Sequence, residues 1–110
     1  MTYTKNISSH INDHLKLIAM IPVLCSESIE FAGAQIAKSL ESDGTLFCWG
    51  NGGSAADSQH LAAELVGRFK KDRKALRSIA LTTDTSVLTC VANDYSYEDI
   101  FSRQLEALAR

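Results

Sequence analysis

The feature that most restricts the fold of this chain is a cluster of glycines between an apolar run and a helical pattern. The segment 45–49 is short and nearly continuously apolar, the turn Gly50–Ser54 reads GNGGS, and Ser54 to about Lys70 has helical periodicity. Glycine lacks a Cβ, so such a turn can adopt positive φ angles and lets a ligand approach the backbone. The pattern predicts a strand buried on both faces, a tight turn and a helix in direct succession.

The rest of the chain predicts further helices around a second strand. We expect helices over 6–20, 26–42, 85–93 and 98–110 and a strand over 77–82, with Pro22 ending the first helix and Asp43-Gly44 ending the second. A strand, a helix and a strand in close succession form a βαβ unit, which builds a parallel sheet. The predicted class is therefore α/β, in which residues 1–43 form a helical segment and 44–110 begin a parallel-sheet core.

Two strands are too few for a stable sheet that helices cover on both faces. The last helical pattern also reaches Arg110 without a cap or a following turn. We therefore expect residues 1–110 to be the N-terminal portion of one longer domain. The alternative is that partner subunits supply the missing strands.

Charge and cysteine content exclude several classes of protein. The net charge is only −2, so no general attraction to nucleic acid or anionic membrane is expected. No segment has the roughly 18 consecutive apolar residues of a membrane span, and the apolar segment 17–25 lacks a signal-peptidase motif. Three cysteines that are widely spaced and odd in number fit a reducing compartment. These features predict a cytoplasmic protein with neither a nucleic-acid nor a membrane partner.

The glycine turn also predicts an anion site. Ser54 is a favourable N-cap, and the N–H groups at the start of the helix behind it suit a phosphate. The turn follows the carboxyl end of a strand, where open α/β sheets bind ligands. The alternative is a tight turn with glycines for packing. A P-loop is excluded because the turn has no lysine, and a dinucleotide site is disfavoured because Asp84 lies too far along the chain.

The helix after the turn has one polar face. A helical wheel gathers Asp57, His60, Glu64 and Arg68 within one arc, opposite an apolar side that includes Leu61, Ala62, Leu65, Val66 and Phe69. A histidine and a glutamate four residues apart can share one divalent metal ion. The alternative is a solvated face on which Glu64 and Arg68 form an ion pair. The residues alone do not decide between the two.

Two further segments lie beyond this helix. The polar, aromatic segment 92–99 (ANDYSYED) follows the second strand and can fold back over the same crevice, although an ordinary helix end and loop is the alternative. The basic segment 68–77 reads as a solvated loop, and steering of an anionic substrate is the other interpretation.

Three segments of the chain closely resemble the phosphoheptose isomerases of the sugar isomerase (SIS) fold. They are GNGGS, the pattern H-x-x-x-E-L-x-G-R-F that follows it, and ALTTDTSVLTCVANDYSYEDIF. The resemblance extends from the N-terminal helices to Arg110. It implies a three-layer αβα fold with a parallel sheet and N-terminal helices. Members of this family continue with a serine/threonine-rich phosphate loop and with a later helix that carries a Gln and a His.

The resemblance also implies roles for individual residues. Asn51, Gly52 and Gly53 would line the substrate, Ser54 would hold its phosphate, His60 and Glu64 would ligate zinc, and Asn93 and Asp94 would contact the substrate. Glu64 would also bind the substrate and move a proton between C1 and C2. The remaining zinc ligands would lie beyond Arg110.

The implied reaction converts sedoheptulose 7-phosphate to D-glycero-D-manno-heptose 7-phosphate through an enediolate. It is the first step toward ADP-heptose and the lipopolysaccharide core, and the resemblance implies a homotetramer with active sites between subunits. The alternative is a non-catalytic SIS-domain scaffold that binds a replication-initiation protein. A scaffold has no need of a carboxylate behind the glycine turn, so Glu64 favours the enzyme.

Overall fold

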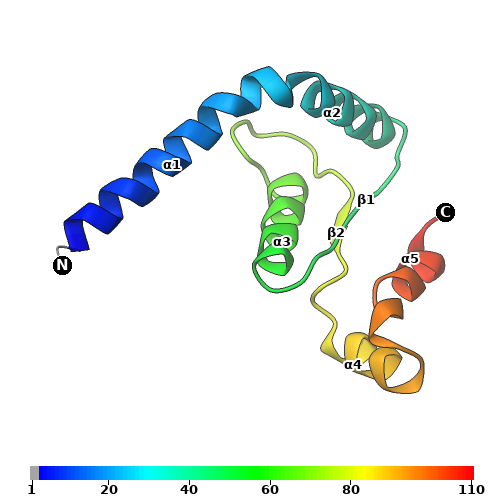
Figure 1. Ribbon diagram of the computed structural model, residues 1–110. Coiled ribbons are helices and arrows are strands. Elements are labelled where there is room, and N and C mark those ends of the chain that lie inside the picture. The colour runs from blue at the N-terminus through cyan, green and yellow to red at the C-terminus, as the bar shows by residue number, and fades with distance from the viewer. Residues whose placement is uncertain (1–2) are drawn as a thin grey trace. The chain divides into compact units, whose positions relative to one another are not determined.

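The computed structural model describes residues 3–110 and has the α/β class predicted from the sequence (Figure 1). Its elements are α1 (Tyr3–Leu24), α2 (Ser26–Glu41), β1 (Leu46–Cys48), α3 (Gly53–Val66), β2 (Ser78–Ala80), α4 (Thr85–Asp94), the 3₁₀ helix η1 (Tyr97–Asp99) and α5 (Ser102–Leu108). The chain divides into two compact units, one up to Ala37 and the other from Lys38.

The first helix is longer than the sequence predicted. Pro22 lies inside α1 and does not end it, so the prediction that proline separates the first two helices is wrong. Proline lacks one N–H group, but the backbone of the next residues still bonds normally, since Cys25 N–H donates to Ile21 O at 2.8 Å. The break between α1 and α2 falls at Cys25 instead.

The second helix ends at the predicted Asp43-Gly44 pair. Gly44 N–H donates to Ser39 O at 2.8 Å and Asp43 N–H to Leu40 O at 3.3 Å, which is the bonding pattern of a Schellman motif. The left-handed residue is Asp43, with φ 59°, and not the glycine. Gly44 is required for space, because a Cβ there would lie 2.7 Å from Ser39 O.

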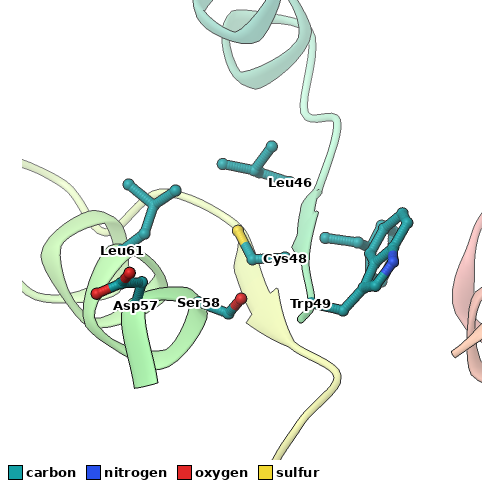
Figure 2. Close-up of a pocket in the computed structure, with 7 residues that line it drawn as sticks. Leu46, Cys48, Trp49, Asp57, Ser58 and Leu61 are labelled. Atoms are coloured by element: carbon teal, nitrogen blue, oxygen red, sulfur yellow. The ribbon is translucent and has the colours of Figure 1, made fainter. Parts of the chain in front are cut away.

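The two strands form the predicted parallel pair, in the register Leu46↔Ser78, Phe47↔Ile79 and Cys48↔Ala80. Figure 1 shows α3 and the α4–α5 segment on opposite sides of this pair, which is an αβα layering. Side chains of β1 and of the next residue, Trp49, alternate accordingly: in Figure 2, Leu46 and Cys48 point toward α3 and Trp49 points away from it. On that other side, the rings of Trp49 and Phe101 have centroids 6.5 Å apart.

The strands are shorter and less buried than predicted. All three residues of β1 are half-buried, and Trp49 is exposed. Among residues 3–110, β1 pairs only with β2, so its second edge and part of each face have no cover. Among residues 3–110, the buried apolar core is small and consists of Ala62, Leu81, Val91 and Ile100.

Helix α3 contacts the sheet through small residues. Ser58 and Ala62 are its buried residues, and the Ser58 hydroxyl is satisfied by Ser54 O at 2.7 Å. The wheel correctly grouped Ala62 with the inner side, but Leu61, Val66 and Phe69 are exposed in this chain. Small side chains let the helix approach the strands closely, which leaves the larger ones outside the contact.

The predicted helix over 98–110 is divided. Ser96 Oγ accepts a hydrogen bond from Glu98 N–H at 3.1 Å and caps η1, and α5 begins only at Ser102. Asp84 caps α4 through a bond from Val87 N–H to Oδ1 at 3.0 Å. Within residues 3–110, no single helix has the length and apolar character to cross a membrane, although the bent pair α1 and α2 passes that test when taken together.

Candidate functional site

Two of the glycines in the turn meet separate steric needs. At Gly50 a Cβ would lie 2.6 Å from the Ser54 Cβ, so glycine lets the strand end approach α3. Gly52 has φ 56°, a conformation that other residues adopt at a cost. At Gly53 neither reason applies, because a Cβ would meet no atom within 4 Å. The absent side chain of Gly53 leaves open space at the start of α3.

The start of α3 differs from the predicted serine cap. The N-cap is Gly52 and no side chain caps the helix, so the prediction that Ser54 is the N-cap is wrong. Ser54 N–H instead donates to Asn51 O at 3.0 Å and Ala55 N–H to Gly52 O at 3.1 Å, which tightens the first turn. No described residue accepts a hydrogen bond from the N–H of Gly52 or Gly53, so these two groups remain for an anion.

A crevice of about 400 Å³ opens beside the glycine turn. Gly50, Asn51 and Gly52 line one wall, and the facing wall includes Thr89 of α4 and Tyr97 of η1. The Tyr97 hydroxyl donates a hydrogen bond to Asn51 Oδ1 at 2.8 Å. The prediction that the segment after α4 folds back over the crevice is therefore confirmed, through a tyrosine that the sequence did not single out.

The pair His60 and Glu64 lies on the outer face of α3. His60 Nε2 is 3.5 Å from Glu64 Oε1, and the Glu64 side chain is 30% exposed against 78% for His60. Two ligands of a tetrahedral zinc ion are about 3.4 Å apart, so this pair fits two positions of such a site. Within residues 3–110 no group of three or more His, Cys, Asp or Glu side chains could hold a metal ion.

Arg73 is an important residue that sequence reasoning missed. Its Nη2 donates to Glu64 O at 2.7 Å and its Nη1 to Leu65 O at 2.9 Å, so the guanidinium caps the carboxyl end of α3. The Glu64–Arg68 ion pair of the alternative interpretation does not form in the described chain, because α3 ends at Val66 and Gly67 is its C-cap. The only signal in the sequence was a basic residue soon after the helix.

The glycine turn and the His60–Glu64 pair lie at opposite ends of α3. Gly53 and Glu64 are separated by about 16 Å along the axis at 1.5 Å per residue. The turn lines the crevice, whereas His60, Glu64 and Arg73 line a separate groove of about 390 Å³ on the same helix. Within the described chain, the two groups therefore line different hollows.

Asn93 and Asp94 lie at the carboxyl end of α4 and bond to each other. Asn93 Nδ2 donates to Asp94 Oδ1 at 2.9 Å, and the Cys90 thiol donates to Asp94 Oδ2 at 3.4 Å. The Asn93 amide and then the Cys90 thiol lower the pKa of Asp94. The hydrogen bond to Asp94 raises the pKa of Cys90. Neither Asn93 nor Asp94 lines the crevice, and their contact with a substrate stays a prediction.

The fold and the glycine turn at the head of α3 define a class of protein. The family model for the SIS domain matches residues 10–110, and the chain belongs to this family.

The following three relatives of the chain are all phosphoheptose isomerases. The chain is 53% identical over 106 residues to a phosphoheptose isomerase from Geotalea daltonii, covering 96% of this chain and 55% of the relative. It is 48% identical to one from Paramagnetospirillum magneticum, covering 100% of this chain and 57% of the relative. The structure of phosphoheptose isomerase from Neisseria gonorrhoeae matches with a TM-score of 0.89 at 36% identity, covering 99% of this chain and 56% of that one. The chain thus spans about half the length of these relatives.

Proposed function

We propose that this chain is part of an aldose–ketose isomerase that converts sedoheptulose 7-phosphate to D-glycero-D-manno-heptose 7-phosphate. The observation that carries the proposal is the Glu64 carboxylate beside His60 on α3, in a chain similar to phosphoheptose isomerases. The reaction would be the first step toward ADP-heptose and the lipopolysaccharide core, in the cytoplasm.

The residues of the chain suit the chemistry of this reaction. Isomerisation removes a proton from one carbon and returns one to its neighbour, through an enediolate, and a carboxylate can carry that proton. Glu64 is the acid/base in this proposal. The glycine turn and Ser54 bind the phosphate, and Asn51 and Gly53 orient the sugar, so that remote binding energy positions the reacting carbons. Asn93 and Asp94 contact the substrate.

A zinc ion is also proposed, with His60 and Glu64 as two of its ligands. Their separation of 3.5 Å is that of neighbouring ligands in a tetrahedral site. The remaining ligands would come from outside residues 1–110. When bound, the ion would stabilise negative charge on the substrate oxygens.

We further propose that the protein is a homotetramer whose active sites are shared between subunits. Two observations support this. The glycine turn and Glu64 line two separate hollows of one chain. The apolar stripe of α1, formed by Ile7, Ile11, Leu15 and Ile18, is exposed. A second copy would cover such a stripe and bring the two halves of the site together.

The test uses Glu64→Gln in the intact protein, with Glu106→Gln as the control because Glu106 is an exposed carboxylate on α5. Glu64→Gln should lower kcat by about 10²- to 10⁴-fold and abolish exchange of the C1 proton with solvent deuterium. Glu106→Gln should match the wild type. Zinc content is measured in each sample. A Glu64→Gln protein that retains zinc and exchanges at the wild-type rate would contradict the proposal.

The shared site has its own test. Asn51→Ala and Glu64→Gln proteins should each be weakly active. They are unfolded, mixed and refolded together. Mixed tetramers contain some sites with both residues intact, so activity should rise above that of either variant. No rise, with mixed tetramers confirmed by mass spectrometry, would show that both residues act within one chain.

A further inference from the structure

The crevice beside the glycine turn contains a polar contact that the proposed function leaves unused. The Tyr97 hydroxyl donates to Asn51 Oδ1 at 2.8 Å, although the two residues are 46 positions apart in the sequence. Both side chains line the crevice. Tyr97 is therefore next to any ligand that the glycine turn binds.

Tyr97 is held in place from the side of the sheet. Ile100, just after η1, is buried with 4% exposure. Gln104 Nε2 donates to Ile100 O at 2.7 Å and to Leu81 O at 3.0 Å, which ties this segment to the residue after β2. The backbone that carries Tyr97 is consequently anchored to the sheet, and the Tyr97 side chain, which is 62% exposed, reaches back to the crevice through its bond to Asn51.

The bond to Tyr97 determines how Asn51 presents its amide. An asparagine side chain has one acceptor oxygen and an NH₂ group with two donors. The Tyr97 hydroxyl donates its hydrogen bond to the Asn51 side-chain oxygen. No residue within 3–110 accepts a hydrogen bond from Asn51 Nδ2. The two N–H donors are therefore available to an acceptor atom of a ligand.

We propose that Tyr97 is a positioning residue for the substrate. It holds the Asn51 oxygen, and Asn51 Nδ2 then donates to a hydroxyl or phosphate oxygen of the sugar phosphate. This inference rests on the proposed function, which supplies the ligand. Without the tyrosine hydroxyl, the amide can rotate and present its oxygen, which repels an anionic oxygen of the ligand.

The experiment compares Tyr97→Phe with Tyr95→Phe in the intact protein. Both changes remove one hydroxyl and keep the ring. Tyr95 is an exposed residue whose ring lies 3.9 Å from the Arg103 guanidinium and makes no hydrogen bond to Asn51. Tyr97→Phe should lower kcat/KM for sedoheptulose 7-phosphate about two- to tenfold, mainly through KM, which is the effect of one net hydrogen bond. Tyr95→Phe should match the wild type.

A double-mutant cycle separates positioning from direct contact with the substrate. If Tyr97 acts through Asn51, adding Tyr97→Phe to Asn51→Ala should cause no further loss. Wild-type kinetics in Tyr97→Phe, or losses that multiply in the double variant, would overturn the inference.

A second measurement does not depend on activity. The side-chain NH₂ signals of Asn51 are compared in nitrogen-15 spectra of the ligand-free proteins. They should shift in Tyr97→Phe and stay in place in Tyr95→Phe. If the wild type neither binds nor isomerises the sugar phosphate, the proposed function fails, and this spectrum still decides whether Tyr97 orients Asn51. Unchanged signals in Tyr97→Phe would overturn the inference.

Discussion

Replacement of Arg73 by alanine should loosen the carboxyl end of the helix that carries Glu64. The Arg73 guanidinium contacts the carbonyl oxygens of Glu64 at 2.7 Å, Leu65 at 2.9 Å, Lys74 at 3.0 Å and Gly67 at 3.3 Å. Nη1 has two hydrogens for three of these oxygens, so about three good bonds form in all.

The size of the effect follows from these bonds. Each exposed hydrogen bond contributes about 0.5–1 kcal/mol, and a cation at a helix carboxyl end adds about 0.3–1 kcal/mol. Ordering the arginine side chain costs up to about 2 kcal/mol. We therefore expect Arg73→Ala to destabilise the last turn of α3 by about 1–2 kcal/mol. Arg73→Lys keeps the charge but not the planar fork of donors, and should lose about half as much.

Amide hydrogen exchange measures this change locally. Leu76 N–H donates to Leu65 O at 3.0 Å, the same oxygen that accepts from Arg73. Its exchange should become about 5- to 30-fold faster in Arg73→Ala, since about 1.4 kcal/mol corresponds to a factor of ten. Arg68→Ala is the matched control, because Arg68 is an exposed arginine in the same loop. Equal exchange at Leu76 in both variants would refute the capping role.

Two further predictions concern the glycine turn and α4. Gly52→Ala should destabilise the protein by about 1 kcal/mol, because φ is 56° at this position. Gly53→Ala should preserve stability and weaken binding of the sugar phosphate. Equal thermal midpoints for the two variants would contradict this prediction. The hydrogen bond to Asp94 raises the pKa of Cys90 and stabilises its thiol form. This contribution to stability is present below the ordinary pKa of a cysteine while Asp94 is ionised, and it is lost as the pH rises through the raised pKa of Cys90. Asp94→Ala should therefore speed alkylation of Cys90 near pH 8 relative to the exposed Cys25, and an unchanged ratio of the two rates would argue against the coupling.

The sequence predicted the order of elements because local patterns carry that information. The apolar run before GNGGS and the periodicity after it required a strand, a turn and a helix, and the parallel pairing of β1 with β2 followed from that order. The pair His60 and Glu64 was predictable for the same reason, since residues four apart on one helix always face the same way.

Some features near the helix ends depended on details that propensity does not resolve. Ser54 is a favourable N-cap residue, yet the N-cap is Gly52, two residues earlier and with a positive φ, so Ser54 lies inside the helix. Pro22 falls within the last turn of α1, where it removes one backbone hydrogen bond, but the helix continues past it because the bond from Cys25 N–H to Ile21 O still forms. In both places the preference of the single residue did not decide where the helix begins or ends.

Contacts between distant segments were decided only by the tertiary structure. The bond from Tyr97 to Asn51 and the capping of α3 by Arg73 join residues whose spacing follows no helix or strand period. The burial of Ser58 and Ala62, in place of Leu61 and Val66, depends on how closely α3 approaches the strands. A sequence pattern gives the direction of a side chain relative to its own element. What that side chain meets is set by packing between elements, so the walls of the crevice appear only once the chain is folded.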